Sequence, residues 1–355
     1  MKRRNSRKIK VGNLVIGGNS PIIIQSMTKT DTKDLKATIN QIKELEDVGC
    51  ELVRVALVDK EAALCISKIK KEVKIPIIGD VHFSSEIAKI ALEEGIDKIR
   101  LNPGNIRNQN KLKKVIILAK KLKVPIRIGV NAGSLNKKKY SLPTPKNLVS
   151  SALEYISFFE DLNFFDIIIS LKACDIYTTI EAYKLMERKT DYPFHIGITE
   201  AGIPNYGLIK SAVGCGILAF LGLADTIRVS LTAPPVEEVI AAYQILKALS
   251  LRNYGPEIIS CPTCGRCRID LFPIVAEFNK ELQKRYSFFK LNNLNSFKVA
   301  LMGCEVNGPG EAKMAEVGIA CGKSGAVLFK KGKIVRKIHE KEIIETLLEE
   351  IDRVI

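Results

Sequence analysis

The sequence predicts an α/β fold, a (β/α)₈ barrel followed by a smaller α+β domain. From residue 22 to about 250, short β-branched runs alternate eight times with amphipathic runs, which is typical of a parallel sheet and matches a closed barrel. The alternation stops at the segment LRNYGP, residues 251–256. We therefore expect domains at residues 1–250 and 251–355. An open, doubly wound sheet is the alternative, but it would more often carry a glycine fingerprint after its first strand.

The eight predicted strands are short apolar runs, many of them ending in polar residues. They lie at 22–28, 52–57, 75–83, 97–105, 125–133, 165–173, 194–202 and 225–232. The first helix has Leu35, Ile39, Ile42 and Leu45 at helical spacing and stops at Gly49, a natural residue after a helix end. Further helices are expected near 59–73, 84–94, 109–122, 147–162, 177–188, 207–222 and 235–250.

The remaining segment of about 100 residues has a mixed pattern. It contains a helical stretch (LFPIVAEFNKELQKRY), an apolar strand that ends at Cys304, a hairpin-like AVLFKKGKIVRKI and a final helical stretch (EKEIIETLLEEIDRVI). These elements do not alternate regularly, so they predict an α+β domain rather than more of the barrel.

Composition bounds the possible functions. The chain has 355 residues, a formal charge of +16 and no run of eighteen apolar residues, so we expect no membrane span. The basic N-terminus lacks the apolar core of a signal peptide, which predicts a cytoplasmic protein. The positive charge leaves nucleic acid, an acidic partner or a small polyanionic substrate open. Aromatic residues are scarce and no nucleic-acid motif is present, so nucleic-acid binding is the least favoured class.

Nine cysteines fall into two groups. Five lie in apolar patterns and are expected in the core: Cys50, Cys65, Cys174, Cys215 and Cys321. The other four are Cys261, Cys264 and Cys267, in the segment CPTCGRC, and Cys304. A CxxC turn presents two thiolates to one ion or cluster, and Cys304 is well placed to close the site. Spacing alone fits an iron–sulfur cluster and a structural zinc equally well. Buried free thiols are the plain alternative.

Polar side chains follow the predicted barrel strands, where barrel enzymes carry their active sites. They are Arg54, Asp80, His82, Arg100, Asn102, Arg127, Asn131, Lys172, Glu200, Arg228 and Ser230. Five of them are cations and only two are carboxylates, an excess that favours phosphate over a metal ion. For any single residue, a salt bridge that caps the barrel is an equal alternative. Of the three histidines, only His82 is placed to touch a ligand; His195 sits too early in its strand.

Several motifs together carry a family resemblance: SMTKTDT, GDVHF, RLNPGN, RIGVNAGSL, SLKACD, GITEAG, IRVSLT, SCPTCGR and GCEVNGPGEA. The chain resembles bacterial 4-hydroxy-3-methylbut-2-enyl diphosphate synthases over nearly its whole length, in their short two-domain form. The resemblance implies reductive ring opening and dehydration of 2-C-methyl-D-erythritol 2,4-cyclodiphosphate to (E)-4-hydroxy-3-methylbut-2-enyl diphosphate. Reduced flavodoxin or ferredoxin would supply two electrons.

The resemblance also implies a [4Fe–4S] cluster, held by Cys261, Cys264, Cys304 and Glu311. The cations and polar side chains at the strand ends would bind the cyclic diphosphate, and Asn307 would orient it beside the cluster. Glu200 is the candidate acid for the departing oxygen. A head-to-tail homodimer, in which the cluster domain of one subunit covers the barrel of the other, is implied as well.

Some alternatives stay open at this point. Spacing alone would favour Cys267 as the fourth ligand, whereas the resemblance makes it a bystander beside Glu311. Lys172 is placed where a Schiff-base lysine would sit, so a phosphosugar aldolase or isomerase with a structural zinc domain is the second function class.

Overall fold

The computed structural model describes residues 3–82, 84–102, 108–136, 138–286, 294, 297–305, 311–322 and 325–354. The chain divides into two compact units, Met1–Arg252 and Asn253–Ile355. None of the helices in these residues is long and apolar enough to cross a membrane.

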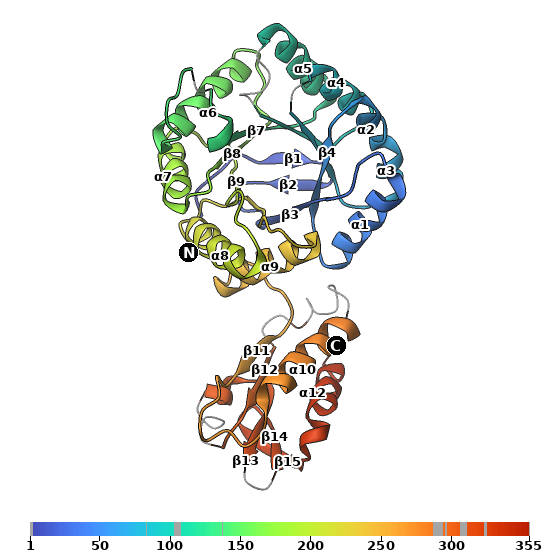
Figure 1. The fold of residues 1–355 in the computed structure, drawn as a ribbon, viewed down its shortest axis with the longest axis vertical. Coiled ribbons are helices and arrows are strands. Elements are labelled where there is room, and N and C mark those ends of the chain that lie inside the picture. The colour runs from blue at the N-terminus through green and yellow to red at the C-terminus, as the bar shows by residue number, and fades with distance from the viewer. Residues whose placement is uncertain are drawn as a thin grey trace. The chain divides into compact units, whose positions relative to one another are not determined.

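Eight parallel strands form the centre of the first unit (Figure 1). They are β3 (Ile23–Met27), β4 (Leu52–Leu57), β5 (Ile77–Val81), β6 (Lys98–Leu101), β7 (Ile126–Asn131), β8 (Ile167–Lys172), β9 (His195–Ile196) and β10 (Thr226–Ile227). Their order is β8-β7-β6-β5-β4-β3-β10-β9, and a parallel bridge between Ile169 and Phe194 joins β8 to β9. The sheet therefore closes into the predicted barrel, and the alternative prediction of an open, doubly wound sheet is wrong.

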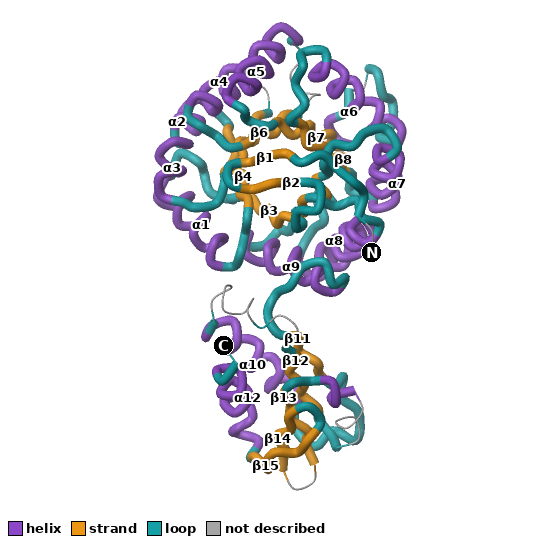
Figure 2. The backbone as a smooth tube through the Cα atoms, turned by 180° about the vertical axis from the view of Figure 1, so that it is seen from behind, coloured by secondary structure: helices purple, strands orange, loops and turns teal. Residues whose placement is uncertain are grey.

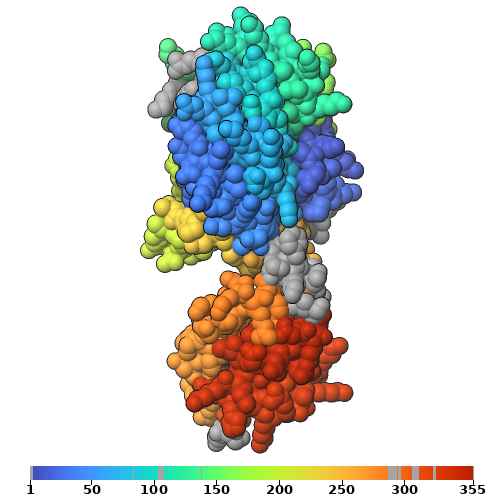
Figure 3. Space-filling view, turned by 90° about the vertical axis from the view of Figure 1, so that its right-hand side faces the viewer, coloured from blue at the N-terminus to red at the C-terminus, as the bar shows by residue number. Residues whose placement is uncertain are grey.

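Helices surround these strands on all sides (Figure 2). They are α1 (Leu35–Asp47), α2 (Lys60–Leu64), α3 (Ile66–Glu72), α4 (Ser85–Glu93), α5 (Gln109–Leu122), α6 (Pro145–Glu160), α7 (Ile176–Glu187), α8 (Pro204–Phe220) and α9 (Pro235–Ala248), with a 3₁₀ turn η2 (Ala132–Ser134). The predicted helix 59–73 is two helices that meet at Cys65. In the space-filling view of Figure 3, the blue and teal side chains of the first half of the barrel form a continuous outer surface.

Polar side chains fix where many of these helices begin. The side chains of Asp34, Asp59, Ser84, Asn108, Thr144 and Asp175 each accept a hydrogen bond from a backbone N–H in the first turn of the following helix. Such caps satisfy donors that have no partner within the helix. The loops at the carboxyl ends of several strands therefore end at defined residues, which helps to position the strand ends that face them.

An unpredicted hairpin lies across the N-terminal end of the barrel (Figure 1). Its strands, β1 (Ile9–Val11) and β2 (Leu14–Ile16), are antiparallel. Ile9, Val11 and Ile16 are buried in one cluster with residues from the barrel strands, Ile23, Leu52, Ile78 and Ile168. This apolar cluster fills the interior of the barrel at its N-terminal end, so a ligand would enter the interior from the carboxyl ends of the strands.

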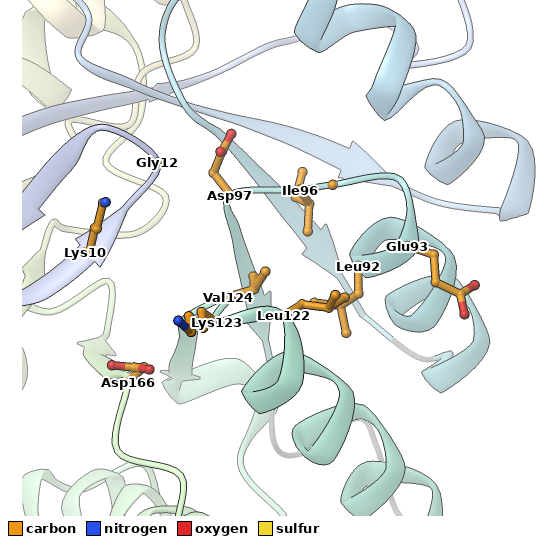
Figure 4. A pocket seen from close by; sticks show the side chains of 11 residues that line it. Lys10, Gly12, Leu92, Glu93, Ile96, Asp97, Leu122, Lys123, Val124 and Asp166 are labelled. Atoms are coloured by element: carbon orange, nitrogen blue, oxygen red, sulfur yellow. The ribbon is translucent and has the colours of Figure 1, made fainter.

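A surface hollow of about 600 Å³ lies beside this hairpin (Figure 4). Its lining includes Gly12 of the hairpin turn and Asp97, Val124 and Asp166, which precede β6, β7 and β8. It is thus at the N-terminal end of the strands, where conserved features of such barrels serve stability rather than catalysis. We do not place the candidate site there.

The second unit is a five-stranded mixed sheet with two helices. Its strands are β11 (Glu257–Ser260), β12 (Lys298–Met302), β13 (Val317–Gly322), β14 (Gly325–Lys330) and β15 (Lys333–Ile338), in that order. The first three run parallel and the last three antiparallel. Helices α10 (Leu271–Arg285) and α12 (Ile343–Asp352) bury apolar residues against the sheet, and η3 (Glu311–Met314) and η4 (Glu340–Glu342) are 3₁₀ turns. The predicted helices, strand and hairpin are confirmed, whereas β11 and β13 were not predicted.

Candidate anion pocket and cysteine loops

The cationic side chains predicted at the strand ends come together inside the mouth of the barrel. Register explains this, because inward-facing positions recur every second residue along a strand. Arg54 pairs with Ile78 across β4 and β5, and Arg100 pairs with Arg127 across β6 and β7. Arg100 and Arg127 are almost fully buried, with 4% and 1% of their surface exposed. Guanidinium groups are thus held together at a depth where water screens their charges poorly.

Asp80 is the carboxylate that holds one side of this cluster. Its Oδ1 lies 3.2 Å from Arg100 Nη1 and its Oδ2 lies 3.9 Å from Arg54 Nε. His82 Nε2 is 3.1 Å from Asp80 Oδ2 and 3.1 Å from Arg100 Nη1. Burial alone would raise the pKa of Asp80, but Arg54, His82 and Arg100 hold it well below its usual range. Asp80 is therefore ionised and orients both arginines.

Glu238 holds the opposite side and was missed by the sequence analysis. It lies in the first turn of α9 and is 1% exposed. Its carboxylate is 3.4 Å from Arg228 Nη2 and 3.3 Å from Lys29 Nζ, and it accepts the backbone N–H of Leu231 at 3.1 Å. Burial and the charge of Arg54 nevertheless lower the pKa of Arg228 to about 10. Acidic residues are common in the first turn of a helix, where they interact favourably with the helix dipole. The sequence alone therefore does not distinguish Glu238 from other acidic residues at helix starts.

Lys172, at the end of β8, contacts His195 of β9 rather than a carboxylate. Lys172 Nζ is 3.1 Å from His195 Nε2, and His195 Nδ1 is 2.8 Å from Thr226 Oγ1. Burial and the nearby cations Lys172 and Arg127 hold the pKa of His195 well below its usual value. A neutral imidazole can accept from Lys172 and donate to Thr226. His195 thus lies deep in its strand, as expected, but it supports a residue of the pocket.

Two glycines make room for these long side chains. A Cβ on Gly129 of β7 would lie 2.7 Å from Arg100 Nε, and a Cβ on Gly197 would lie 2.7 Å from Lys172 Nζ. A larger residue at Gly129 would therefore displace Arg100. At Gly197 it would displace Lys172 and also meet the backbone oxygen of Arg228, at 2.5 Å. The glycines in RIGVNAG and FHIGITEAG sit on the inward-facing register of their strands, a signal that the sequence analysis did not use.

Lys98 is a further cation that was missed. It lies two residues before Arg100 on β6 and is fully buried, and among the described residues its Nζ has no hydrogen-bond partner. Arg127 Nε and Nη1 also lack one in this part of the chain. Burial and the nearby Arg127 and Arg54 hold the pKa of Lys98 well below its usual value. The pattern Lys98, Arg100, Asn102 at steps of two was the available signal.

The other predicted site residues lie at the rim or outside the described residues. Asn102 is buried, Asn131 and Ser230 are half-buried, and Glu200 is exposed. Glu200 has a left-handed backbone, φ +52°, and accepts a hydrogen bond of 3.2 Å from the thiol of Cys174. The expectation that Cys174 is a core residue is wrong, because the loop after β8 carries it to the surface. Asn307 lies outside the described residues.

Of the other cysteines expected in the core, three are confirmed there and one is not. Cys50, Cys215 and Cys321 are buried, whereas Cys65, at the junction of α2 and α3, is only half-buried. The pKa of the Cys321 thiol is raised to about 12, by burial first and then by Cys267, Glu340 and Cys304. Cys321 thus lies close to the predicted cysteine site, although its position in the sequence did not place it there.

In the second unit, the predicted cysteines lie on loops that leave adjacent strands. Strands β11 and β12 are parallel and in register, with Ser260 opposite Leu301, so Cys261 and Cys304 follow the same edge of the sheet. The backbone N–H of Cys261 donates to the Leu301 carbonyl at 3.1 Å. Cys304 is 3% exposed and Cys264 is exposed. Three thiols at one sheet edge are the donors that an iron–sulfur cluster takes.

The CPTC turn is shaped for a sulfur ligand. Thr263 has φ +64°, and its N–H donates to Cys261 Sγ at 3.2 Å. Hydrogen bonds of this kind stabilise thiolates and tune iron–sulfur centres. Within the described residues, however, no three His, Cys, Asp or Glu side chains are arranged around a common centre for a metal ion. The cysteine thiols are thus suitable ligands for a cluster and lie on neighbouring loops. The side chain of Glu311 is not among those that the structure describes.

Cys267 packs on the backbone next to Cys304. A Cβ on Gly303 would lie 2.3 Å from Cys267 Sγ, so only glycine fits there. The thiol of Cys267 donates to the Ile269 carbonyl at 3.2 Å, and the backbone N–H of the neighbouring Arg268 donates to the Gly303 carbonyl at 2.8 Å. These contacts give Cys267 a packing role between the two loops. Whether it also binds metal stays a prediction.

Comparison with known proteins covers both units. The GcpE TIM-barrel domain matches residues 6–243, and the GcpE protein C-terminal domain matches residues 257–353. The chain is 51% identical to 4-hydroxy-3-methylbut-2-en-1-yl diphosphate synthase (flavodoxin) of Caldanaerobacter subterraneus subsp. tengcongensis, over 99% of this chain and 98% of the relative. It is 48% identical to the protein of that name from Clostridium perfringens, over 100% of both.

A solved structure shows the barrel fold independently. The dihydropteroate synthase of Yersinia pestis has a TM-score of 0.52 with this chain, at 11% identity, and covers 68% of this chain and 98% of its own. At that identity the likeness concerns the fold alone. The two domain matches and the relatives, which match over nearly their full length, go further: the chain belongs to the GcpE family, together with these 4-hydroxy-3-methylbut-2-en-1-yl diphosphate synthases.

Proposed function

We propose that the protein converts 2-C-methyl-D-erythritol 2,4-cyclodiphosphate into (E)-4-hydroxy-3-methylbut-2-enyl diphosphate by reductive ring opening and dehydration. The names of its relatives support the product class. The observation that carries the proposal for this chain is the pocket itself, where, among the described residues, four arginines and three lysines lie near only two buried carboxylates, Asp80 and Glu238. Such an excess of cations at the carboxyl end of the barrel fits a ligand with two phosphates.

The pocket residues would divide the work of binding. Arg54, Arg100, Arg127, Lys172 and Arg228 would grip the phosphate oxygens, while His82, Asn102, Asn131 and Ser230 would donate further hydrogen bonds, and Asn307 would orient the ring. Burial strengthens each of these charged contacts, because water does not compete for the phosphates. Glu200 would protonate the departing oxygen from the rim, where the Cys174 thiol holds its carboxylate.

The cofactor in this proposal is one [4Fe–4S] cluster per subunit. Cys261, Cys264, Cys304 and Glu311 would hold it, with Cys267 packing between the loops. When bound, the cluster would pass the two electrons to the substrate one at a time. The residues of the chain would position the substrate, exclude water and deliver the proton. The cluster thiols lie in a different compact unit from the cationic pocket.

The partners follow from the same assignment. The names of the relatives specify flavodoxin, so we infer reduced flavodoxin as the electron donor, with ferredoxin as the alternative. We also infer a cytoplasmic location. None of the nine cysteines, all of which lie in the described residues, forms a disulfide, as in proteins of reducing compartments.

We further propose the head-to-tail homodimer, because it lets the cluster of one subunit meet the pocket of the other. An exposed apolar stripe on α8 supports self-association. Tyr206, Ile209, Val213, Ile217 and Phe220 are 40–74% exposed, at helical spacings of three and four. Contiguous exposed apolar surface of this kind marks interaction sites. In a symmetric dimer, the same stripe would pack against its copy.

Anaerobic purification followed by iron and sulfide analysis tests this function. We expect about four iron and four sulfide per chain, and turnover of the cyclodiphosphate with a strong reductant. Cys304→Ser should lose the cluster absorbance and the activity. Cys65→Ser, a half-buried thiol outside the cysteine loops, is the matched control and should keep both.

The competing functions give different results in the same experiment. Zinc without iron, together with borohydride trapping of a phosphosugar on Lys172, would support a barrel aldolase or isomerase. Nucleic-acid binding that falls steeply with salt would support the third class. Loss of the cluster in Cys267→Ser would instead make Cys267 a ligand and correct the assignment of Glu311.

A further inference from the structure

Beneath the arginines of the pocket lies a tier of buried polar side chains. Gln25 on β3 is opposite Leu52, and Lys98 on β6 is opposite Ile78. Leu52 and Ile78 both belong to the apolar cluster that closes the N-terminal end of the barrel. Gln25 and Lys98 therefore stand where the apolar end of the barrel gives way to the pocket. They are 1% and 0% exposed.

The polar atoms of this tier are unsatisfied. Among the described residues, Lys98 Nζ, both amide atoms of Gln25, and Nε and Nη1 of Arg127 have no hydrogen-bond partner. An unpaired polar group in a protein interior costs stability, and an unpaired charge costs more. Proteins rarely keep such atoms unless something outside the chain satisfies them.

The charges around Lys98 make the position costlier still. The charged groups that act on it are Arg127, on the neighbouring β7, and Arg54, on β4. His195 of β9 also feels the charge of Lys98, together with Lys172 of β8 and Arg127. No carboxylate in the described residues forms an ion pair with Lys98, Arg127 or Lys172; Asp80 pairs with Arg54 and Arg100, and Glu238 with Arg228 and Lys29.

An apolar residue in place of Lys98 would be compatible with the apolar cluster at the N-terminal end of the barrel. It would also avoid the loss of stability that an unpaired buried amine causes. A lysine there makes sense if an anion supplies the missing acceptors and the missing negative charge. Water could satisfy the hydrogen bonds but could not neutralise the cations. The ligand with the required chemistry is the one proposed for the pocket above, a phosphate ester with several negative charges.

We propose that Lys98 is the floor of the anion pocket, an amine kept without a protein partner so that it can bind and neutralise the phosphate groups of the ligand together with Arg127. This inference rests on the proposed function, since it names a further binding residue of the same site. A bound anion would raise the pKa of Lys98 again, because a nearby negative charge favours an ammonium. We therefore expect ligand binding to take up protons in the pH range where this shift changes the charge of Lys98.

Calorimetric titration with the cyclodiphosphate, without reductant, tests the proposal. We expect Lys98→Met to weaken binding roughly 10- to 100-fold, the range for loss of a hydrogen bond between charged groups. In buffers of different ionisation enthalpy, the wild type should take up more protons on binding than the variant. The ligand-free variant should melt about 2–8 °C higher, because an unpaired buried amine has been replaced by an apolar chain.

Control variants separate this result from other causes. Lys113→Met removes the same charge from the exposed face of α5 and should change neither affinity nor proton uptake. Lys98→Gln keeps a polar end but loses the charge, so it should show the same fall in affinity if the methionine variant does not fold. Wild-type affinity and proton uptake in both Lys98 variants would overturn the inference alone. If the wild type did not bind the cyclodiphosphate, the proposed function would fall together with it.

Discussion

At the scale of single residues, the pocket depends on a glycine that has no side chain as well as on the charged side chains. Arg100 can reach Asp80 only because Gly129, on the next strand, has no side chain. A Cβ there would lie 2.7 Å from Arg100 Nε and 3.3 Å from Ser170 Oγ, with no backbone atom among its closest neighbours. The strand could therefore accept an alanine, but the guanidinium would have to move. In the proposed function, Gly129 would affect substrate binding through the position of Arg100.

Gly129→Ala should separate binding from folding. We expect affinity for the cyclodiphosphate to fall by about tenfold, as for one weakened charged hydrogen bond, with the melting temperature little changed. Gly133→Ala is the matched control, because a Cβ at Gly133, just beyond the same strand, would meet nothing within 4 Å. Calorimetric titration and a thermal melt measure both quantities. Equal affinities in the two variants would show that Arg100 does not need its present position.

The sequence predicted the polar residues near the ends of the strands better than those deeper in the barrel. Arg100 and Asn102, or Arg127 and Asn131, could be found from polar residues at even steps near strand ends. Lys98 was missed, and His195 was set aside, because both lie earlier in their strands, where an apolar core is the usual expectation. Glu238 comes from a helix behind the strands, and its contact with Arg228 depends on tertiary packing that no local pattern records.

At the scale of elements, the hairpin β1–β2 determines which end of the barrel is open. Its buried face adds Ile9, Val11 and Ile16 to the apolar cluster, while Val15 on the opposite face is 41% exposed. Alternation across the hairpin thus separates a core face from a solvent face within three residues. By closing one end, the hairpin keeps water away from the buried cations, which strengthens their attraction for an anion.

Ile16→Ala should lower stability without changing the pocket. We expect the free energy of unfolding to fall by about 2–5 kcal/mol, the usual cost of such a core truncation. Val15→Ala, one residue away and exposed, should change it by no more than about 0.5 kcal/mol. Urea denaturation measures both. Affinity for the cyclodiphosphate should stay at the wild-type value in folded protein, and a parallel loss of affinity would mean that the closed end shapes the pocket directly.

Elements were predicted well where periodicity was long and poorly where it was short. Helices such as α5 and α9 lie within a residue or two of their predicted ranges. By contrast, the predicted strands 194–202 and 225–232 shrink to two residues each, β9 and β10. Their polar ends leave the sheet to form loops of the pocket. The three-residue strands of the hairpin flank the dipeptide Gly12–Asn13, which is a two-residue turn signal that the sequence analysis did not use.

At the scale of the whole molecule, the chemistry is divided between two units with separate cores. The cationic pocket lies in the unit Met1–Arg252 and the cysteine loops lie in the unit Asn253–Ile355. In the proposed function, electrons from a cluster held by the second unit would have to reach a ligand held by the first. In the proposed head-to-tail dimer, each complete site takes its pocket from one subunit and its cluster from the other. The stripe on α8 would hold the subunits together.

Mixing two inactive variants tests this arrangement. Arg127→Met removes a pocket cation and keeps the cluster, while Cys304→Ser removes a cluster ligand and keeps the pocket. In a mixed head-to-tail dimer, the pocket of the Cys304→Ser subunit meets the cluster of the Arg127→Met subunit, so one of the two sites is complete. Random exchange should therefore restore roughly a quarter of wild-type activity.

If native mass spectrometry showed mixed dimers that stayed inactive, each chain would have to build its site from its own two units. Adding Ile209→Asp on α8 to both variants should block dimer formation and remove the restored activity, because a charge in an apolar interface loses its hydration without gaining a partner.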